Sequence, residues 1–466
     1  MKENGKAAYL ATGICLSILV LFMLSIGVRL GTQQILIKRM RMENVFTHLV
    51  FWDQPNLAST SNIDIDWQAL YPFEETEPVT GRPESWCFNL ADSYATTVQT
   101  LKDKIERYSI DFLTGRGLMI GWYRNYNSLT GWRIPEICTD SKIIYMKNGY
   151  LAEEVPRTSE NAMAEIGNAV LDFSRYLEDV EIPLYYINAG GKVNPEDKEL
   201  YPQDIIREFS NENQDALLKA LSDRGINTLD LRETMLSEDL DWYAAYYKTD
   251  IHWKVETGLW AARTIAQMLN EQEGFEFDSH LFEESSYVMT TYEDCFLGEL
   301  GRGCTAFAPD RESYTCILPR FETDFAVEIP SSGVMRAGSY KEALYDYEHL
   351  QNVLSYSDSD HLTLTQLDAY YSVTWRNDAV GIFKNNSTKD NADKKILMLQ
   401  DSYSWYSTTY LACDAGEIHV IHPEQFDGSI RAYVKELQPD VVIVMYCGRN
   451  IKAIDLSSHT SMFDFR

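Results

Sequence analysis

Short apolar strands alternate with amphipathic helices in two stretches of this sequence, and this pattern restricts the fold more than any other feature. Five apolar residues recur at intervals of three and four, as on one face of a helix: Met163, Ile166, Val170, Phe173 and Leu177. Residues 441–444 are apolar on both faces, as in a central parallel strand. Strands separated by helices of this length form parallel βαβ units. The sequence therefore predicts an α/β fold, with a parallel sheet flanked by helices in an α/β/α sandwich.

The alternation also predicts individual elements. Strands are expected at 142–146, 182–188, 228–231, 395–400, 417–421 and 440–446. Helices are expected at 163–177, within 203–222, and at 255–269, 405–413 and 428–437. Between about 274 and 393 the alternation stops and Gly and Pro recur, which predicts a long insertion with some antiparallel pairing.

The first part of the chain predicts a membrane anchor. Residues 7–28 are uncharged and mostly apolar, follow Lys2 and Lys6, and are long enough to span a bilayer as a helix. A cleaved signal peptide would have a shorter apolar run and a small-x-small exit, so an uncleaved anchor is favoured. Basic residues at 38–41 weaken the charge argument for orientation, but the large acidic remainder favours export of the C-terminal part.

These features divide the chain into three predicted parts. Residues 1–30 would form a cytoplasmic tip and transmembrane anchor, and residues 31–138 a membrane-proximal stem. Residues 139–460 would form the α/β domain, interrupted by the insertion at about 274–393. The expected location is the cell membrane, with a single pass and an extracytoplasmic α/β domain.

Charge and cysteine content narrow the possible ligands. A net charge of −29 argues against nucleic acid, because release of counterions from a phosphate backbone requires clusters of Lys and Arg. No CxxC spacing suggests a metal site and no Gly-rich phosphate cradle is recognisable, so neither a metal nor a cofactor is expected. Cys295, Cys304 and Cys316 fit either one disulfide or separate buried thiols.

Two predicted strand ends carry groups suited to nucleophilic chemistry. Ser402 follows the strand at 395–400, where its hydroxyl and the next backbone N–H groups, including that of Tyr403, would point to one place. Asn450 follows the strand at 440–446 and supplies a side-chain amide donor. Because the carboxyl ends of parallel strands meet at one edge of a sheet, these groups are expected to lie together.

A serine hydroxyl needs a base within hydrogen-bond reach, and the base needs an acceptor that orients it. His252 can be the base and Asp250 the acceptor, because they stand two residues apart just ahead of a predicted helix. Each piece alone has a simpler explanation: Asp-Ser is a common helix N-cap, Asp-x-His is often a surface pair, and residues 448–450 would make an ordinary turn. Their joint occurrence at strand ends favours a serine triad over a metal half-site, which lacks further ligands.

The same residues resemble a known family. Asp401-Ser402 and Gly448-Arg449-Asn450 are similar to the first and third blocks of the SGNH hydrolases. Residues 249–253, Thr-Asp-Ile-His-Trp, resemble the Asp-x-His-Trp block of the alginate-acetylation and DHHW-type branch, in which this block also precedes the serine block. Further similar stretches are 147–151, 296–302, 319–325 and 426–429.

The chain departs from the family pattern at two positions. Gln400 stands where the serine block usually has Gly and could crowd the turn, and Ile251 replaces a commoner polar residue or His. Neither change removes a catalytic atom. Gly416 and Gly428 are both candidates for the family's glycine block.

The resemblance implies a membrane-anchored, extracytoplasmic O-acetyltransferase that acts on a cell-surface or secreted polysaccharide. Ser402 would be the nucleophile, His252 the base and Asp250 its partner. The backbone N–H of Ser402 or of Tyr403, together with the Asn450 side chain, would bind the oxyanion. A polytopic membrane acyltransferase would deliver the acetyl group.

Two alternatives use the same sequence features. A carbohydrate acetylesterase would keep the same triad, and a non-catalytic glycan-binding or assembly protein would keep only the fold. Transfer to sugar would require exclusion of water. Aromatic residues near His252 could stack on sugar rings, with about half of them expected in the core instead: Trp242, Tyr243, Tyr246, Tyr247 and Trp253.

Overall fold

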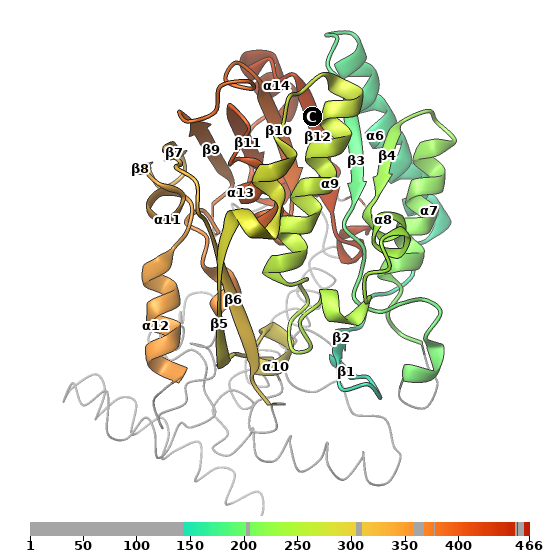
Figure 1. Ribbon diagram of the computed structural model, residues 1–466. Coiled ribbons are helices and arrows are strands. Elements are labelled where there is room, and N and C mark those ends of the chain that lie inside the picture. The colour runs from blue at the N-terminus through green and yellow to red at the C-terminus, as the bar shows by residue number, and fades with distance from the viewer. Residues whose placement is uncertain are drawn as a thin grey trace, which may run out of the picture. The chain divides into compact units, whose positions relative to one another are not determined.

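The computed structural model describes residues 143–201, 206–303, 310–357, 368–376, 378–452, 454 and 461–466 (Figure 1). These residues lie in one of the two compact units of the chain. The predicted anchor at 1–30 and stem at 31–138 lie outside the described residues. No helix within the described ranges is long and apolar enough to cross a membrane.

An eight-stranded sheet forms the centre of the described unit. Its strand order is β4-β3-β12-β10-β11-β9-β7-β8. Five adjacent strands are parallel: β4 (Asn227–Asp230), β3 (Leu184–Asn188), β12 (Val441–Tyr446), β10 (Lys395–Gln400) and β11 (Glu417–Ile421). β12 is central, since Val444 pairs with Leu399 of β10 on one side and Tyr186 of β3 on the other.

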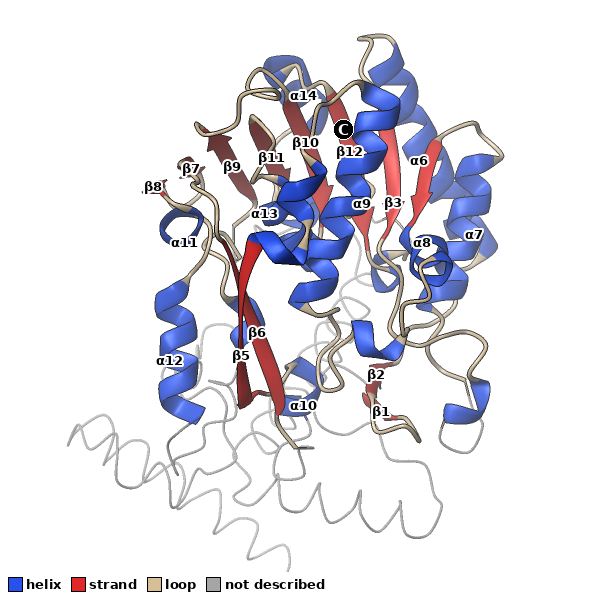
Figure 2. Ribbon diagram, viewed as in Figure 1, coloured by secondary structure: helices blue, strands red, loops and turns tan. Residues whose placement is uncertain are grey.

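Helices cover both faces of this sheet (Figure 2). One face packs against α9 (Val255–Glu273) and α13 (Trp405–Leu411), and the other against α6 (Glu160–Glu178), α7 (Ser210–Ser222) and α14 (Ile430–Leu437). Successive strand residues point to opposite faces, so Ile443 joins the first core while Val442 and Val444 join the second. This arrangement confirms the predicted sheet flanked by helices.

The helix boundaries follow from local chemistry. α6 begins after Ser159, whose side chain accepts a hydrogen bond from the backbone N–H of Ala162. Its apolar stripe is buried, as the spacing of Ile166, Val170 and Phe173 predicts. α9 ends at Gly274, which adopts φ of 64°, a left-handed conformation that glycine reaches at little cost.

The insertion adds strands to the same sheet, so the predicted parallel sheet is extended into a mixed sheet. β7 (Phe325–Ile329), β8 (Val334–Gly338) and β9 (Val380–Asn385) continue it with antiparallel pairing. A short turn with Gly333 at φ of 65° joins β7 to β8, and a connection this short can only join antiparallel neighbours. The predicted antiparallel pairing within the insertion is therefore confirmed.

The remaining elements lie outside the central sheet. β5 (Tyr287–Phe296) and β6 (Glu312–Pro319) form an antiparallel pair, and β1 (Ile143–Tyr145) and β2 (Leu151–Glu153) form a hairpin. The predicted first strand is thus confirmed as a strand but not as part of the central sheet. The other helices are α8 (Leu231–Ser237), α10 (Glu299–Gly303), α11 (Tyr340–Ala343) and α12 (Tyr347–Ser357).

Substitution of Leu397 in β10 tests how much the core beneath α6, α7 and α14 contributes to the stability of the protein. The side chain is fully buried, so Leu397→Ala should lower the free energy of unfolding by about 2–5 kcal/mol. Urea denaturation measures this change. Leu236→Ala is the matched control, because Leu236 is 58% exposed and its loss should cost less than about 0.5 kcal/mol. Equal destabilisation by the two substitutions would contradict the assigned core.

Candidate active site

The loops that follow β10 and β12 meet at the carboxyl edge of the sheet. Asp401 follows β10, and one of its carboxylate oxygens accepts hydrogen bonds from the backbone N–H of Cys447 and from Asn450 Nδ2, both at 2.8 Å. Its other oxygen accepts from the backbone N–H of Tyr403 at 3.0 Å. Asp401 is 2% exposed, so this buried carboxylate joins the ends of two adjacent strands.

Asp250, His252 and Ser402 lie in one hydrogen-bonded row. His252 Nδ1 is 2.5 Å from Asp250 Oδ1, and His252 Nε2 is 2.8 Å from Ser402 Oγ. A carboxylate only accepts hydrogen bonds, so Nδ1 carries the proton and Nε2 is free to accept from the serine hydroxyl. Asp250 and His252 are buried, whereas Ser402 is partly exposed. The geometry can pass the serine proton to His252.

The environment of Asp250 keeps its carboxyl ionised. Burial by itself raises the pKa of Asp250, but the adjacent His252 and the nearby Arg302 hold the pKa well below its usual range. The second carboxylate oxygen accepts the backbone N–H of Glu299 at 2.6 Å. An ionised Asp250 is the state that orients the imidazole and stabilises its protonated form.

The insertion builds the support for the loop 247–252, which carries Asp250 and His252. Gly298 lies against Asp250, where an added Cβ would approach the Asp250 backbone within 2.4 Å. The N–H of Gly301 donates to the carbonyl of Thr249 at 2.7 Å. Glu312 accepts the backbone N–H groups of Lys248 and Thr249, both at 2.7 Å. The stretch 296–302, quoted above for its resemblance, therefore has a direct structural role.

Tyr370 covers the imidazole. Its ring stacks on His252 with centroids 4.2 Å apart and an interplanar angle of 17°. Its hydroxyl donates weakly to the backbone carbonyl of Ser402 at 3.4 Å. Sequence reasoning missed this residue, because it lies in the irregular insertion and at no predicted strand end.

Two of the expected oxyanion donors, Tyr403 and Asn450, are in contact with Asp401. That carboxylate engages the Tyr403 N–H, while Asn450 Nδ2 donates to Asp401 and also lies 3.7 Å from Cys447 Sγ, which is only a weak acceptor. Ser402 begins the short 3₁₀ helix η10 (Ser402–Ser404), and the first N–H groups of a helix have no acceptor within it. Asp401 therefore holds the Tyr403 N–H, and the Ser402 N–H and the Asn450 amide remain the candidates for an oxyanion site.

Three of the aromatic residues expected to stack on sugar are core residues instead. Tyr246 and Trp253 are 0% exposed and Tyr247 is 1% exposed, within the core formed by α9 and α13. They offer no ring face to a ligand. The expectation was wrong because aromatic residues beside a catalytic loop also fill the space beneath it.

The two departures from the family pattern have structural explanations. The Gln400 side chain is buried and accepts a hydrogen bond from Thr408 Oγ1 of α13 at 2.5 Å, so it points into the helix contact. Ile251 is 8% exposed and packs in a small apolar cluster with Ile143, Leu151 and Leu300. Of the two glycine candidates, Gly416 directly precedes β11, at the edge opposite Ser402.

The described cysteines are free thiols, and Cys304 lies outside the described residues. Cys295, Cys316, Cys413 and Cys447 are free and buried, which corresponds to the buried-thiol alternative for Cys295 and Cys316. Over the ranges that the structure describes, no group of three or more His, Cys, Asp and Glu side chains is arranged for a metal ion.

Substitution of Asp401 tests whether its carboxylate holds the ends of β10 and β12 together. Asp401→Asn replaces one acceptor oxygen by a donor, so one buried N–H loses its partner and stability should fall by about 1–3 kcal/mol in urea denaturation. Asp427→Asn is the control, since Asp427 is exposed and its change should stay within about 0.5 kcal/mol. Wild-type stability of Asp401→Asn would contradict the role of this carboxylate.

Comparison with known proteins gives a family match over part of the chain and a similar fold. Residues 150–320 match the family described as SGNH hydrolase-like domain, acetyltransferase AlgX. A search of curated protein sequences gives no significant match.

Among solved structures, PatB1 from Bacillus cereus is similar at 16% identity and a TM-score of 0.55, covering 70% of this chain and 100% of PatB1. PatB1 with a sulfonyl adduct gives 15% identity, the same TM-score, and coverage of 70% and 99%. A DHHW family protein from Eubacterium siraeum gives 14% identity, a TM-score of 0.45, and coverage of 70% and 97%.

At these identities the PatB1 comparison shows a shared fold. The family match includes Asp250, His252 and the stretch 296–302, and it ends before Ser402. The resemblance of this chain to the SGNH hydrolase-like acetyltransferases is confirmed by the family match over residues 150–320.

Proposed function

We propose that this protein is a serine-dependent O-acyltransferase that moves an acetyl group through Ser402 onto hydroxyl groups of a polysaccharide. The observation that carries the proposal is the position of His252, with Asp250 at 2.5 Å on one ring nitrogen and Ser402 at 2.8 Å on the other. The acetyltransferase family that matches residues 150–320 supports the choice of acyl group.

The first half-reaction acetylates the serine. Ser402 Oγ attacks the carbonyl carbon of the acetyl donor while its proton passes to His252 Nε2. Asn450 Nδ2 and the Ser402 N–H stabilise the oxyanion of the tetrahedral intermediate. The intermediate then collapses, and His252 returns the proton to the leaving oxygen of the donor. Asp250 keeps the imidazole oriented and balances its positive charge throughout.

The second half-reaction transfers the acetyl group. His252 takes the proton of a sugar hydroxyl, whose oxygen attacks the acetyl carbonyl, and Ser402 leaves and recovers a proton from His252. Tyr371 is partly exposed and packs against Trp405, with ring centroids 5.2 Å apart, while Trp405 stacks on the His252 ring. This tyrosine replaces the buried Tyr246, Tyr247 and Trp253 as the proposed contact for a sugar ring.

The setting of this reaction is also part of the proposal. A chain anchored by residues 7–28, with its α/β domain outside the cell, has no access to acetyl-CoA. A polytopic membrane acyltransferase that delivers the acetyl group would supply the donor. A carbohydrate acetylesterase is the second candidate, because the same Asp250, His252 and Ser402 geometry serves water as acceptor.

Ser402→Ala and His252→Ala test the triad. Each substitution should lower acetyl transfer by several orders of magnitude, because the nucleophile and the base act as a unit. The measurement is acetyl release from a donor ester, with the product analysed as acetylated oligosaccharide or free acetate. Ser285→Ala, at an exposed serine, is the control and should behave as wild type.

The result separates the candidate functions. Acetylated oligosaccharide as the main product supports the transferase, and acetate alone supports the esterase. Undiminished activity of Ser402→Ala would contradict the triad. The absence of both products with the wild type would leave only the non-catalytic binding protein.

Asn450 tests the oxyanion site. Asn450→Ala should lower kcat by about 100- to 1000-fold with little change in KM, because the lost hydrogen bond strengthens in the transition state. Steady-state kinetics on a donor ester measures both constants. Asn386→Ala, at an exposed asparagine, is the control. An equal rise in KM with unchanged kcat would assign Asn450 to substrate binding instead.

A further inference from the structure

One buried cation contacts the loop that carries Asp250 and His252. Lys192 lies in the segment after β3 and is 5% exposed. Its ammonium donates to the backbone carbonyls of Tyr247 at 3.2 Å, of Lys248 at 3.4 Å, and of Asp250. Three carbonyl groups of four consecutive residues therefore converge on one side chain.

Backbone N–H groups of the same loop donate to a carboxylate, that of Glu312. Glu312 accepts the N–H groups of Lys248 and Thr249, and it also accepts the Thr249 hydroxyl at 2.5 Å. The carbonyls of residues 247, 248 and 250 thus face Lys192, and the N–H groups of residues 248 and 249 face Glu312. This arrangement fixes the orientation of the peptide planes just before His252.

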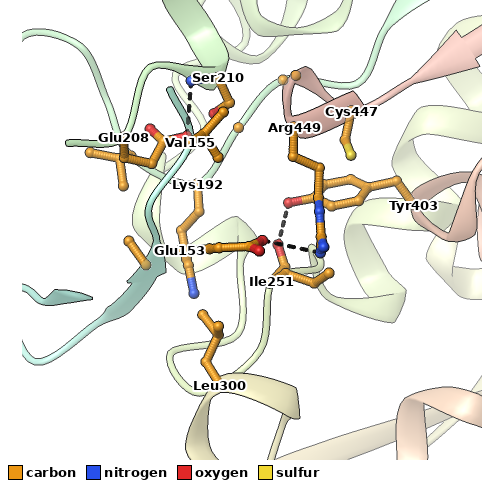
Figure 3. Close-up of a pocket in the computed structure, with 15 residues that line it drawn as sticks. Glu153, Val155, Lys192, Glu208, Ser210, Ile251, Leu300, Tyr403, Cys447 and Arg449 are labelled. Carbon is orange, nitrogen blue, oxygen red and sulfur yellow. Dashed lines mark hydrogen bonds and ion pairs between the residues drawn. The ribbon is translucent and has the colours of Figure 1, made fainter. Parts of the chain in front are cut away.

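The Lys192 side chain borders a cavity of about 40 Å³ (Figure 3). Ile251 and Tyr403 line the same cavity, and the Tyr403 hydroxyl donates to the backbone carbonyl of Ile251. Arg449 pairs with Glu153 across this space at 3.2 Å. Within the described part of the chain Lys192 forms no direct salt bridge, so backbone carbonyls are its hydrogen-bond partners.

We propose that Lys192 is a positioning residue for catalysis: its ammonium aligns the backbone of residues 247–250, so that Asp250 and His252 meet Ser402 in the reactive geometry. This inference rests on the proposed function. Lys192 touches the loop and not the reacting atoms, so it acts through Asp250. A displacement of the loop by about 1 Å would lower the rate by up to about 100-fold.

The charge of Lys192 gives the proposal a pH dependence. The charged groups around it are Asp250, Glu312, Glu208, Glu153 and Arg449. Burial lowers the pKa of Lys192 to about 8, although Asp250, Glu312 and Glu208 each raise it. Above this pH the amine is neutral, holds the three carbonyls less firmly, and the alignment weakens.

Stability changes in the opposite direction over the same range. Between pH about 8 and the ordinary lysine value of about 10.4, the unfolded chain binds more protons at this residue than the folded chain. The contribution of Lys192 to stability therefore rises with pH in this window. Deprotonation of Lys192 therefore does not unfold the protein, and a loss of activity near pH 8 that arises from Lys192 is not a loss of folded protein.

The experiment measures the reactivity of Ser402 in the full chain. Phenylmethylsulfonyl fluoride is the probe, and the rate of Ser402 sulfonylation is followed from about pH 6 to about pH 10, with correction for reagent hydrolysis and with denaturation curves at each pH. Wild type should show a decline with a midpoint near pH 8 while the protein stays folded.

Two variants and one control make the test specific. Lys192→Arg keeps a permanent charge and should lose the decline near pH 8. Lys192→Met should react roughly 10- to 100-fold more slowly at neutral pH and show no decline. Lys219→Met, at a lysine whose side chain is 75% exposed, should match wild type.

Three results would overturn the proposal. The first is a Lys192→Met rate equal to wild type, and the second is an alkaline decline in Lys192→Arg that matches wild type. If Lys192→Met does not fold, the comparison of Lys192→Arg with wild type still decides. The third, absence of sulfonylation at Ser402 in wild type, would overturn the proposed function as well, whereas the first two leave that function intact.

Discussion

The hydrogen bond between His252 and Ser402 joins two segments that are 150 residues apart in the chain. It forms only if the end of β10 and the loop before α9 reach the same place. β10 is fixed between β11 and β12 by parallel pairing, so the position of Ser402 follows from the sheet. The position of His252 is fixed differently, because no strand precedes it directly. Its loop is held by side chains distant in sequence, including Lys192 and Glu312.

Charged side chains hold both segments. The partly exposed Glu312 and the buried Lys192 contact the loop that carries His252, and the buried Asp401 joins the ends of β10 and β12. Asp401 receives three donors, Glu312 receives three, and Lys192 donates to three carbonyls. Removing a charge from water is costly, and several hydrogen bonds to the backbone offset that cost at each position. Each charge in turn restricts the peptide groups around it. The site is therefore held rigid by groups that take no part in the chemistry itself.

The sequence predicted the parts of this arrangement that depend on periodicity. The strands at 395–400 and 440–446 and the helix at 255–269 are found within a few residues of the expected positions, so Ser402, Asn450 and His252 could be placed at strand and helix ends. Tyr370, Glu312 and Lys192 could not be found in this way. Their contacts join residues 55 or more positions apart, and no local pattern marks them. Tyr246, Tyr247 and Trp253 show the converse problem, since composition alone does not distinguish a ligand surface from a core.

Several residues that contact Asp250, His252 and their loop come from the insertion. Gly298, Glu312 and Tyr370 all belong to the insertion, and they contact Asp250, the loop before it and the His252 ring. Ser402 follows a strand of the central sheet, whereas several of the groups around His252 belong to the insertion, beside Lys192 and Trp405 from outside it. A change in the insertion can therefore alter which hydroxyl reaches His252 without moving Ser402. In the proposed reaction, transfer and hydrolysis differ only in the hydroxyl that His252 activates, so the insertion residues packed around His252 are the ones that would affect that choice.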